Sequence, residues 1–204
     1  ADWLERLPDR VWESAAAVGN PFSLGLPFPG ETVVDVGCGA GADACVAATL
    51  TNGEGRVVGI DCTPAMVAKA SRNAQAAGLS NLRFIEAEMS ALPLPDACAD
   101  MVISNGVINL SMDKPRVLAE LFRILRPGGR LQIADMVRDP SCTAHACDTG
   151  GESWADCVSG TLEPVRFLEL LSAAGFADAV MAGFTGYRTS PGTTGALFRG
   201  SRSG

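Results

Sequence analysis

The sequence is poor in basic residues, has one histidine and one tyrosine, and contains no long hydrophobic run. No stretch approaches the roughly 18 consecutive apolar residues that a membrane helix requires, so we expect no membrane partner. The first residues lack the basic segment and apolar core of a secretory signal. The 16 lysines and arginines form no run and are outnumbered by 23 acids, for a net charge of −7, which argues against a nucleic-acid partner.

A regular cysteine framework is also missing. The seven cysteines are an odd number without regular spacing, which favours a reducing compartment, so we expect a cytoplasmic protein. The chain instead has 47% hydrophobic residues over 204 positions, enough to bury one sizeable core. We therefore expect a single domain over residues 1–204 that acts on a small molecule, and composition leaves its oligomeric state open.

A glycine-rich turn follows the first β-forming segment, in the stretch Val33-Val-Asp-Val-Gly-Cys-Gly-Ala-Gly41. Glycines allow positive φ and let the backbone lie against a ligand, while the free N–H groups at the start of the following helix attract an electron-rich group. About twenty residues later a second apolar strand ends in Asp61, whose carboxylate can accept both ribose hydroxyls of a nucleoside. Together the two features predict a nucleotide-binding corner.

An acid, Asp35, lies inside this turn signature. It suits an amino group and would repel a pyrophosphate. The spacing of Gly37, Gly39 and Gly41 also differs from the Gly-x-Gly-x-x-Gly of dinucleotide sites. Both observations disfavour a nicotinamide-dependent oxidoreductase.

Apolar strand-like runs alternate with helical segments from residue 31 onward, a pattern typical of a parallel sheet in an α/β fold. We expect strands near residues 32–36, 57–61, 82–86, 101–104, 130–135, 177–184 and 195–201. We expect helices near residues 41–50, 64–77, 114–126 and 164–174, with short helices near 10–17 and 152–160.

The turn and Asp61 together resemble the S-adenosylmethionine site of the Rossmann-like, class I methyltransferases. Further similarities follow along the chain in Glu88-Met89, Leu92-Pro-Leu-Pro-Asp96, Asp100-Met-Val-Ile-Ser-Asn105 and Leu125-Arg-Pro-Gly-Gly-Arg-Leu131. Within that superfamily the chain is similar to arsenite methyltransferases, through Gly19-Asn-Pro21, Asp61-Cys-Thr-Pro-Ala-Met66, Ile103-Ser-Asn-Gly-Val-Ile-Asn-Leu110 and Cys157-Val-Ser-Gly-Thr-Leu162.

The resemblance implies an α/β, Rossmann-like fold with a mostly parallel, doubly wound, seven-stranded sheet and an antiparallel last strand. It implies an enzyme that transfers a methyl group from S-adenosylmethionine to a small acceptor. Residues 1–30 would form a lid over the cofactor, and residues 139–162 a substrate-side insertion. The alternative for the first segment is that its aromatic residues only cover the sheet edge.

The resemblance also implies a set of cofactor-binding residues. Asp35 would orient the amino group of the cofactor, Asp61 would hold the ribose, and Glu88 would meet the adenine. The full set is Asp35, Gly37, Gly39, Asp61, Cys62, Glu88, Met89 and Asn105.

On the substrate side, Cys157 occupies the position of an arsenic-binding cysteine of the family, so the resemblance implies a catalytic role for it. Trivalent arsenic takes two or three thiolates, and Cys142 and Cys147 lie in the same loop-rich insertion. Gly106 is grouped with these thiols as a substrate-side position. Val18 and Gly106 stand where the family carries cysteine.

Three interpretations of Cys142, Cys147 and Cys157 stay open. They form a soft-metalloid site, they bind zinc together with His145, or they are bystanders in a variable loop. Their spacing matches no common structural zinc pattern, so we predict no resident metal. His145 is also the obvious general base if the acceptor is a hydroxyl or an acidic carbon.

Two further functions also stay open. The departures at Val18 and Gly106 are compatible with an organic acceptor such as a secondary metabolite, and the same scaffold could bind the cofactor without catalysis. We expect Cys38, Cys45, Cys62 and Cys98 to lie in or beside the core as small hydrophobes, without reactive chemistry of their own.

Overall fold

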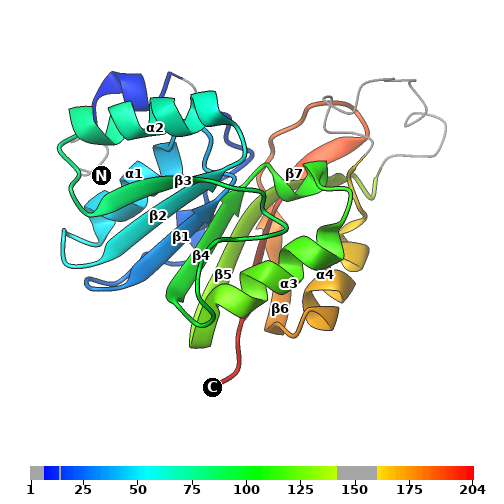
Figure 1. Ribbon diagram of the computed structural model, residues 1–204. Helices are drawn as coiled ribbons and strands as arrows, with labels where there is room; N and C mark the ends of the chain where they lie inside the picture. Colours follow the sequence, from blue (N-terminus) through cyan, green and yellow to red (C-terminus); the bar gives the residue numbers. More distant parts are fainter. Residues whose placement is uncertain (1–6, 14, 142–159) are drawn as a thin grey trace.

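Seven strands form one mixed sheet at the centre of the computed structural model, which describes residues 7–13, 15–141 and 160–204 (Figure 1). The strands are β1 (Thr32–Val36), β2 (Arg56–Asp61), β3 (Leu82–Glu86), β4 (Ala99–Asn105), β5 (Leu125–Arg138), β6 (Ala177–Phe184) and β7 (Thr193–Ser201). The helices are α1 (Ala42–Leu50), α2 (Pro64–Ala76), α3 (Lys114–Ile124) and α4 (Pro164–Ala173), with short 3-10 turns η2 (Asp9–Val11), η3 (Pro21–Leu24) and η4 (Ile108–Leu110).

The strand order is β3-β2-β1-β4-β5-β7-β6. Neighbouring strands from β3 to β5 are parallel, and β7 runs antiparallel to both β5 and β6. This confirms the predicted Rossmann-like sheet with its antiparallel last strand. Because the chain leaves β1 for β2 on one side and later returns to place β4 on the other, the carboxyl ends of β1 and β4 open a crevice between them.

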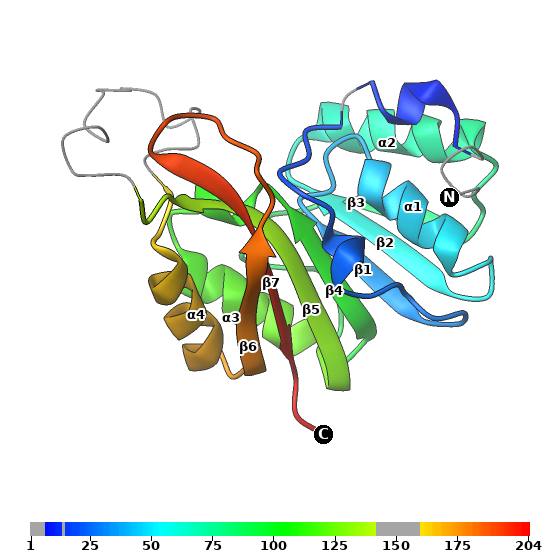
Figure 2. The same ribbon diagram turned by 180° about the vertical axis from the view of Figure 1, so that it is seen from behind.

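Helices cover both faces of the sheet. α1 and α2 lie on one face with the N-terminal segment, and α3 and α4 lie on the opposite face (Figures 1 and 2). Successive residues of β1 alternate between the two cores: Val33 packs on the α1 side and Val34 on the α3 side. Both side chains are buried, which explains why the parallel strands are continuous apolar runs in the sequence.

Two elements differ from the sequence-based expectation. The helix predicted near residues 10–17 is reduced to η2, because the backbone just beyond it is held by tertiary hydrogen bonds described below. β5 begins at Leu125, directly after α3, whereas the sequence predicts a strand only near residues 130–135, because Pro127-Gly-Gly129 are turn-forming residues. Leu125 pairs with Ala99 ahead of a register shift, so the sheet absorbs the turn-like residues as an irregularity in the strand.

The helices of the described residues include none that is long and apolar enough to cross a bilayer. The helix expected near residues 152–160 lies outside the described part of the chain.

Candidate functional site

A cavity of about 310 Å³ lies where the carboxyl ends of β1 and β4 diverge. The glycine-rich turn forms its floor, the end of β4 forms one side, and the N-terminal segment forms a wall over it. Its lining residues are Trp12, Ala15, Ala16, Ala17, Asp35, Gly37, Cys38, Gly39, Ala40, Ala42, Asp43, Met66, Asn105, Gly106 and Val107. We call this cavity the crevice.

Backbone hydrogen bonds hold the turn against the end of β2. The N–H groups of Gly37 and Cys38 both donate to the carbonyl oxygen of Ile60, at 2.8 and 2.9 Å. The Asp61 carboxylate accepts from the N–H of Gly39 at 2.9 Å and from the N–H of Thr63 at 2.9 Å. Asp61 therefore ties the glycine turn to the start of α2 and sets the spacing between them.

Gly37 is required by close packing as well as by its backbone angle. Its φ is +77°, and a Cβ atom there would overlap the side chain of Val107, which lines the crevice. Gly53 has a similar φ of +74°, but a Cβ atom on it would meet no other atom within 4 Å, so it provides a matched control.

We expect Gly37→Ala to destabilise the protein more than Gly53→Ala. Both variants carry the cost of a left-handed alanine, about 1–2 kcal/mol, and only Gly37→Ala adds the overlap with Val107, about 1–3 kcal/mol. Urea unfolding of the two variants measures the difference. Equal free energies of unfolding would show that Val107 moves aside without cost.

A buried acid faces the crevice. Asp35 is almost fully buried, its carboxylate accepts from the N–H of Ala44, and its Oδ2 has no hydrogen-bond partner among the described residues. Burial, together with the nearby charges of Asp43 and Asp61, raises the pKa of Asp35 well above its ordinary value. Burial also raises the pKa of Asp43. Three acids around one small cavity, one with an unpartnered oxygen, are the setting that a cationic group would stabilise.

Asn105 links the crevice to the N-terminal segment. Its Oδ1 accepts from the N–H of Val18 at 3.0 Å, and its Nδ2 donates to the carbonyl of Gly19 at 2.9 Å and to Asp43 Oδ2 at 2.8 Å. From the other side, Thr185 Oγ1 donates to the carbonyl of Val18 at 2.7 Å. These bonds clamp the chain at Val18 and Gly19 and place residues 15–17 as the crevice wall.

The predicted cofactor residues fall into three groups. Asp35, Gly37, Gly39 and Asn105 line the crevice, and Asp61 adjoins it through Gly39. Cys62 and Glu88 are exposed at the same end of the sheet and do not line the crevice, and Met89 packs partly against the main core.

On the substrate side, Gly106 lines the crevice with a φ of +74°. A Cβ atom on it would lie 2.9 Å from Val18 Cγ2, so the two positions that differ from the arsenite methyltransferase pattern are neighbours in space. Cys142, Cys147 and Cys157 lie outside the described residues, as does His145.

Sequence reasoning named none of Asp43, Val107, Met66 and Trp12 individually as crevice residues, although Trp12 belongs to the lid predicted over residues 1–30. Asp43 carried a usable signal, because it is an acid in the first turn of the helix that follows the glycine turn. The other three are apolar residues that core packing would explain equally well, and only the tertiary contacts place them here.

A second buried acid, Asp135 in β5, supports the segment that follows Gly106. It accepts from the N–H groups of Asn109 at 3.1 Å and Met136 at 2.7 Å. Burial raises the pKa of Asp135 to about 7, although these bonds and the charge of Lys114 act in the opposite direction.

We expect the protein to lose stability as the pH rises through about 7. Because the pKa of Asp135 is higher in the folded state than its ordinary value of 3.8, the folded state binds the proton more tightly. The stabilisation is complete below a pH of about 4 and is lost through about pH 7, at about 1.4 kcal/mol for each unit of pKa difference. Asp35 and Asp43 shift in the same direction.

Urea unfolding across this pH range measures the effect. Asp135→Asn cannot titrate, so its free energy of unfolding should depend less steeply on pH, whatever its absolute stability. A variant profile parallel to that of the natural protein would contradict the assignment to Asp135.

Comparison with known proteins agrees with the fold. A family model described as a methyltransferase domain matches residues 27–175. The chain is 39% identical over 161 residues to an arsenite methyltransferase of Halobacterium salinarum, which covers 78% of this chain and 40% of that protein. It is 34% identical over 188 residues to an arsenite methyltransferase of Aquipseudomonas alcaligenes, covering 86% of this chain and 53% of that protein.

A solved structure is similar over the whole chain. The arsenic (III) S-adenosylmethionine methyltransferase of Chlamydomonas reinhardtii matches with a TM-score of 0.82 and 32% identity, covering 100% of this chain and 72% of that one. The chain spans about half the length of the curated relatives described above. Sequence, fold and crevice thus agree that the chain belongs to the Rossmann-like, S-adenosylmethionine-dependent methyltransferases and is related to their arsenite methyltransferases.

Proposed function

We propose that this protein transfers a methyl group from S-adenosylmethionine to a small acceptor. The observation that carries the proposal is the unpartnered, buried oxygen of Asp35 in a crevice that Asp43 also lines and Asp61 adjoins. The amino acid end of S-adenosylmethionine carries an ammonium group beside a sulfonium, so this cofactor supplies the positive charge that the acids lack. The residues present therefore fit the family's cofactor.

The main role proposed for the protein is to bind the cofactor and to orient it toward the acceptor. Asp35 accepts from the amino group, Gly37 and Gly39 allow the backbone to approach the methionine part, and Asp61 accepts from the ribose. Glu88 and Met89 are proposed to meet the adenine, Cys62 stays in the cofactor-binding set, and Asn105 acts by holding the crevice wall. When bound, the sulfonium supplies the methyl group, and alignment with the acceptor is the main catalytic requirement.

Residues 1–30 are proposed to act as the lid, since Trp12 and residues 15–17 already line the crevice. The proposed role of this wall is to exclude water from the sulfonium and the acceptor, between which the methyl group is transferred. Cys38, Cys45, Cys62 and Cys98 are free thiols, which fits the reducing cytoplasm in which we propose that the protein acts.

Arsenite is the proposed acceptor, with Cys157 as the first thiolate and Cys142 and Cys147 as further ligands. The arsenite methyltransferases among its relatives support this choice. Trivalent arsenic prefers thiolates, and its lone pair can attack a methyl group without a general base.

A specific observation favours an organic acceptor as the second candidate. The described crevice wall at Gly106 and Val107 is apolar, Val18 packs beside Gly106, and neither Val18 nor Gly106 supplies the thiol that the family carries there. Cys38 also lines the crevice, but burial raises the pKa of its thiol far above its ordinary range, so it offers no thiolate. A wall of this kind suits a small apolar molecule.

Formation of S-adenosylhomocysteine by the full chain tests these alternatives. Product formation that depends on arsenite supports the first acceptor, and turnover only with organic thiols, phenols or amines supports the second. Tight S-adenosylhomocysteine binding with no turnover on either panel would mean that the protein binds the cofactor without catalysis.

A further inference from the structure

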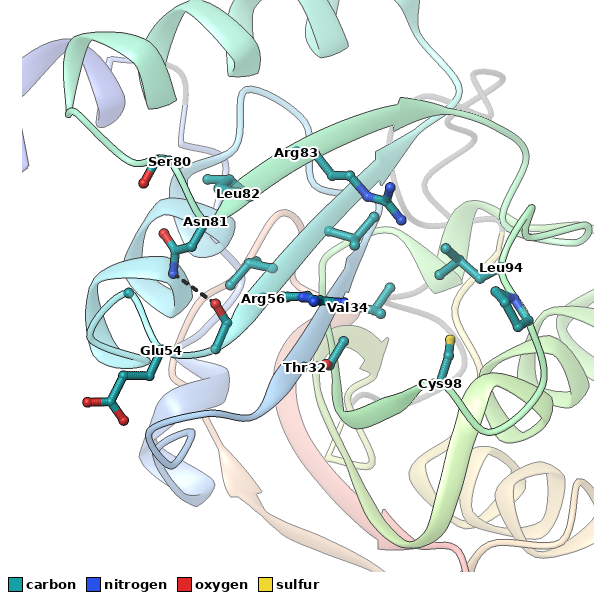
Figure 3. A pocket seen from close by; sticks show the side chains of 15 residues that line it. Thr32, Val34, Glu54, Arg56, Ser80, Asn81, Leu82, Arg83, Leu94 and Cys98 are labelled. Carbon is teal, nitrogen blue, oxygen red and sulfur yellow. Dashed lines mark hydrogen bonds between the residues drawn. The ribbon is translucent and has the colours of Figure 1, made fainter.

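A second cavity lies at the end of the sheet opposite the crevice. It is a groove of about 670 Å³ across the amino ends of β1, β2 and β3 (Figure 3). Leu94, Pro95 and Cys98, from the connection between β3 and β4, form its far wall. The groove exists because α3 and α4 lie over the β4, β5 and β6 side of this face, and the β3–β4 connection contains no helix to cover the rest (Figure 1).

Strand register brings two arginines to the same face of this groove. Thr32 pairs with Arg56, and Val58 pairs with both Val34 and Arg83. Since alternate residues of a strand share a face, all five side chains stand on one side of three adjacent strands. Val34 and Val58 give the groove an apolar floor, and the two arginines lie on neighbouring strands, one row apart.

The two guanidinium groups have no acidic partner. Among residues 7–13, 15–141 and 160–204, neither Arg56 nor Arg83 makes an ion pair or a side-chain hydrogen bond, whereas Arg123 and Arg130 do both. Glu54 is the one acid of the groove lining, and its side chain extends away from both arginines (Figure 3). The groove is thus a positive site in a chain whose net charge is −7.

We propose that this groove binds a small organic anion, in which an apolar body lies on Val34 and Val58 and a carboxylate or phosphate group lies between Arg56 and Arg83. A guanidinium presents a planar pair of donors that matches either anion. The volume falls within the range of small-molecule sites, which favours a small ligand over the flat surface of a protein partner. This site is separate from the crevice and goes beyond the proposed methyl transfer.

Titration calorimetry with octanoate and octyl phosphate tests the proposal on the full chain saturated with S-adenosylhomocysteine, so that the crevice is filled. We expect saturable binding of at least one anion, weakened by added salt, and weaker binding of the neutral octanol. The double variant Arg56→Gln/Arg83→Gln should weaken the anion by at least about tenfold, because it removes two charge-assisted contacts. The relative strength of the two anions distinguishes a carboxylate ligand from a phosphate ligand.

Arg72→Gln is the matched control, because Arg72 lies on α2, outside the groove lining. It should leave anion binding unchanged. All variants should keep their affinity for S-adenosylhomocysteine, which shows that they are folded.

Thiol labelling provides an independent test of where the anion binds. Octanoate should slow maleimide labelling of Cys98, which lines the groove, and leave labelling of the exposed Cys62 unchanged. The proposal is overturned if both anions bind no better than octanol, or if the double variant binds them as tightly as the natural protein does.

Discussion

Asp35→Asn should weaken S-adenosylhomocysteine binding by about 100-fold, which corresponds to about 2.7 kcal/mol and lies within the range for a hydrogen bond to a charged group. The natural carboxylate places a buried, unpartnered oxygen in the crevice, where the amino group of the ligand would meet it. Asparagine has nearly the same shape and can still accept from the N–H of Ala44, but it carries no charge. Titration calorimetry measures the change in affinity.

The pH dependence of S-adenosylhomocysteine binding provides a second test of this prediction. Burial raises the pKa of Asp35 in the free protein, and a bound ammonium group would lower it again. Binding below the free pKa therefore releases a proton, so the affinity of the natural protein should fall as the pH falls, by up to about tenfold for each pH unit. The variant should lose this dependence.

Stability separates a binding defect from misfolding. Because the buried carboxylate is costly when ionised, Asp35→Asn should be at least as stable as the natural protein at any pH at which Asp35 carries its charge. Asp178→Asn is a control on the exposed edge strand β6 and should change neither stability nor binding. Unchanged affinity in Asp35→Asn would remove the acid from the cofactor site.

Cys157→Ala should abolish arsenite binding to the protein preloaded with S-adenosylhomocysteine. Loss of one thiolate from a site of two or three removes a strong bond to a soft centre, so we expect no saturable heat in calorimetry. The S-adenosylhomocysteine affinity of the variant should stay the same, because Cys157 is not proposed to touch the cofactor. Cys142→Ala and Cys147→Ala then identify the remaining ligands.

The converse experiment adds a thiol beside the crevice instead of removing one. Val18→Cys places a thiol beside Gly106, at a position where the family carries cysteine, without adding a side chain at the left-handed Gly106. Arsenite should bind this variant more tightly than the natural protein if arsenic enters the crevice. If the arsenite affinity is the same in Cys157→Ala, in Val18→Cys and in the natural protein, the search for the acceptor should turn to organic molecules.

The sequence by itself determined the sheet and the chemical character of the crevice floor. Apolar strand runs, the glycine turn, and Asp35 and Asp61 at their spacing are local patterns, and local patterns report local structure directly. All seven expected strands are present, and the antiparallel last strand follows from the family resemblance.

The tertiary structure alone decided how the crevice is closed. Asn105 bonds to residues 86 and 87 positions away, and Thr185 bonds to Val18 across 167 positions. These contacts override the helical tendency of the preceding alanines, because a backbone hydrogen bond to the core outweighs a weak local propensity. No periodic pattern encodes such contacts.

The groove and the unpartnered oxygen of Asp35 were also decided by the tertiary structure alone. Both depend on which side chains meet when distant strands pair: the register of β1, β2 and β3 places Arg56 and Arg83 on one face, and the burial of Asp35 follows from the helix packed over it. The sequence shows which residues carry charge, and the packed fold decides which of those charges lack a partner and which cavity they face.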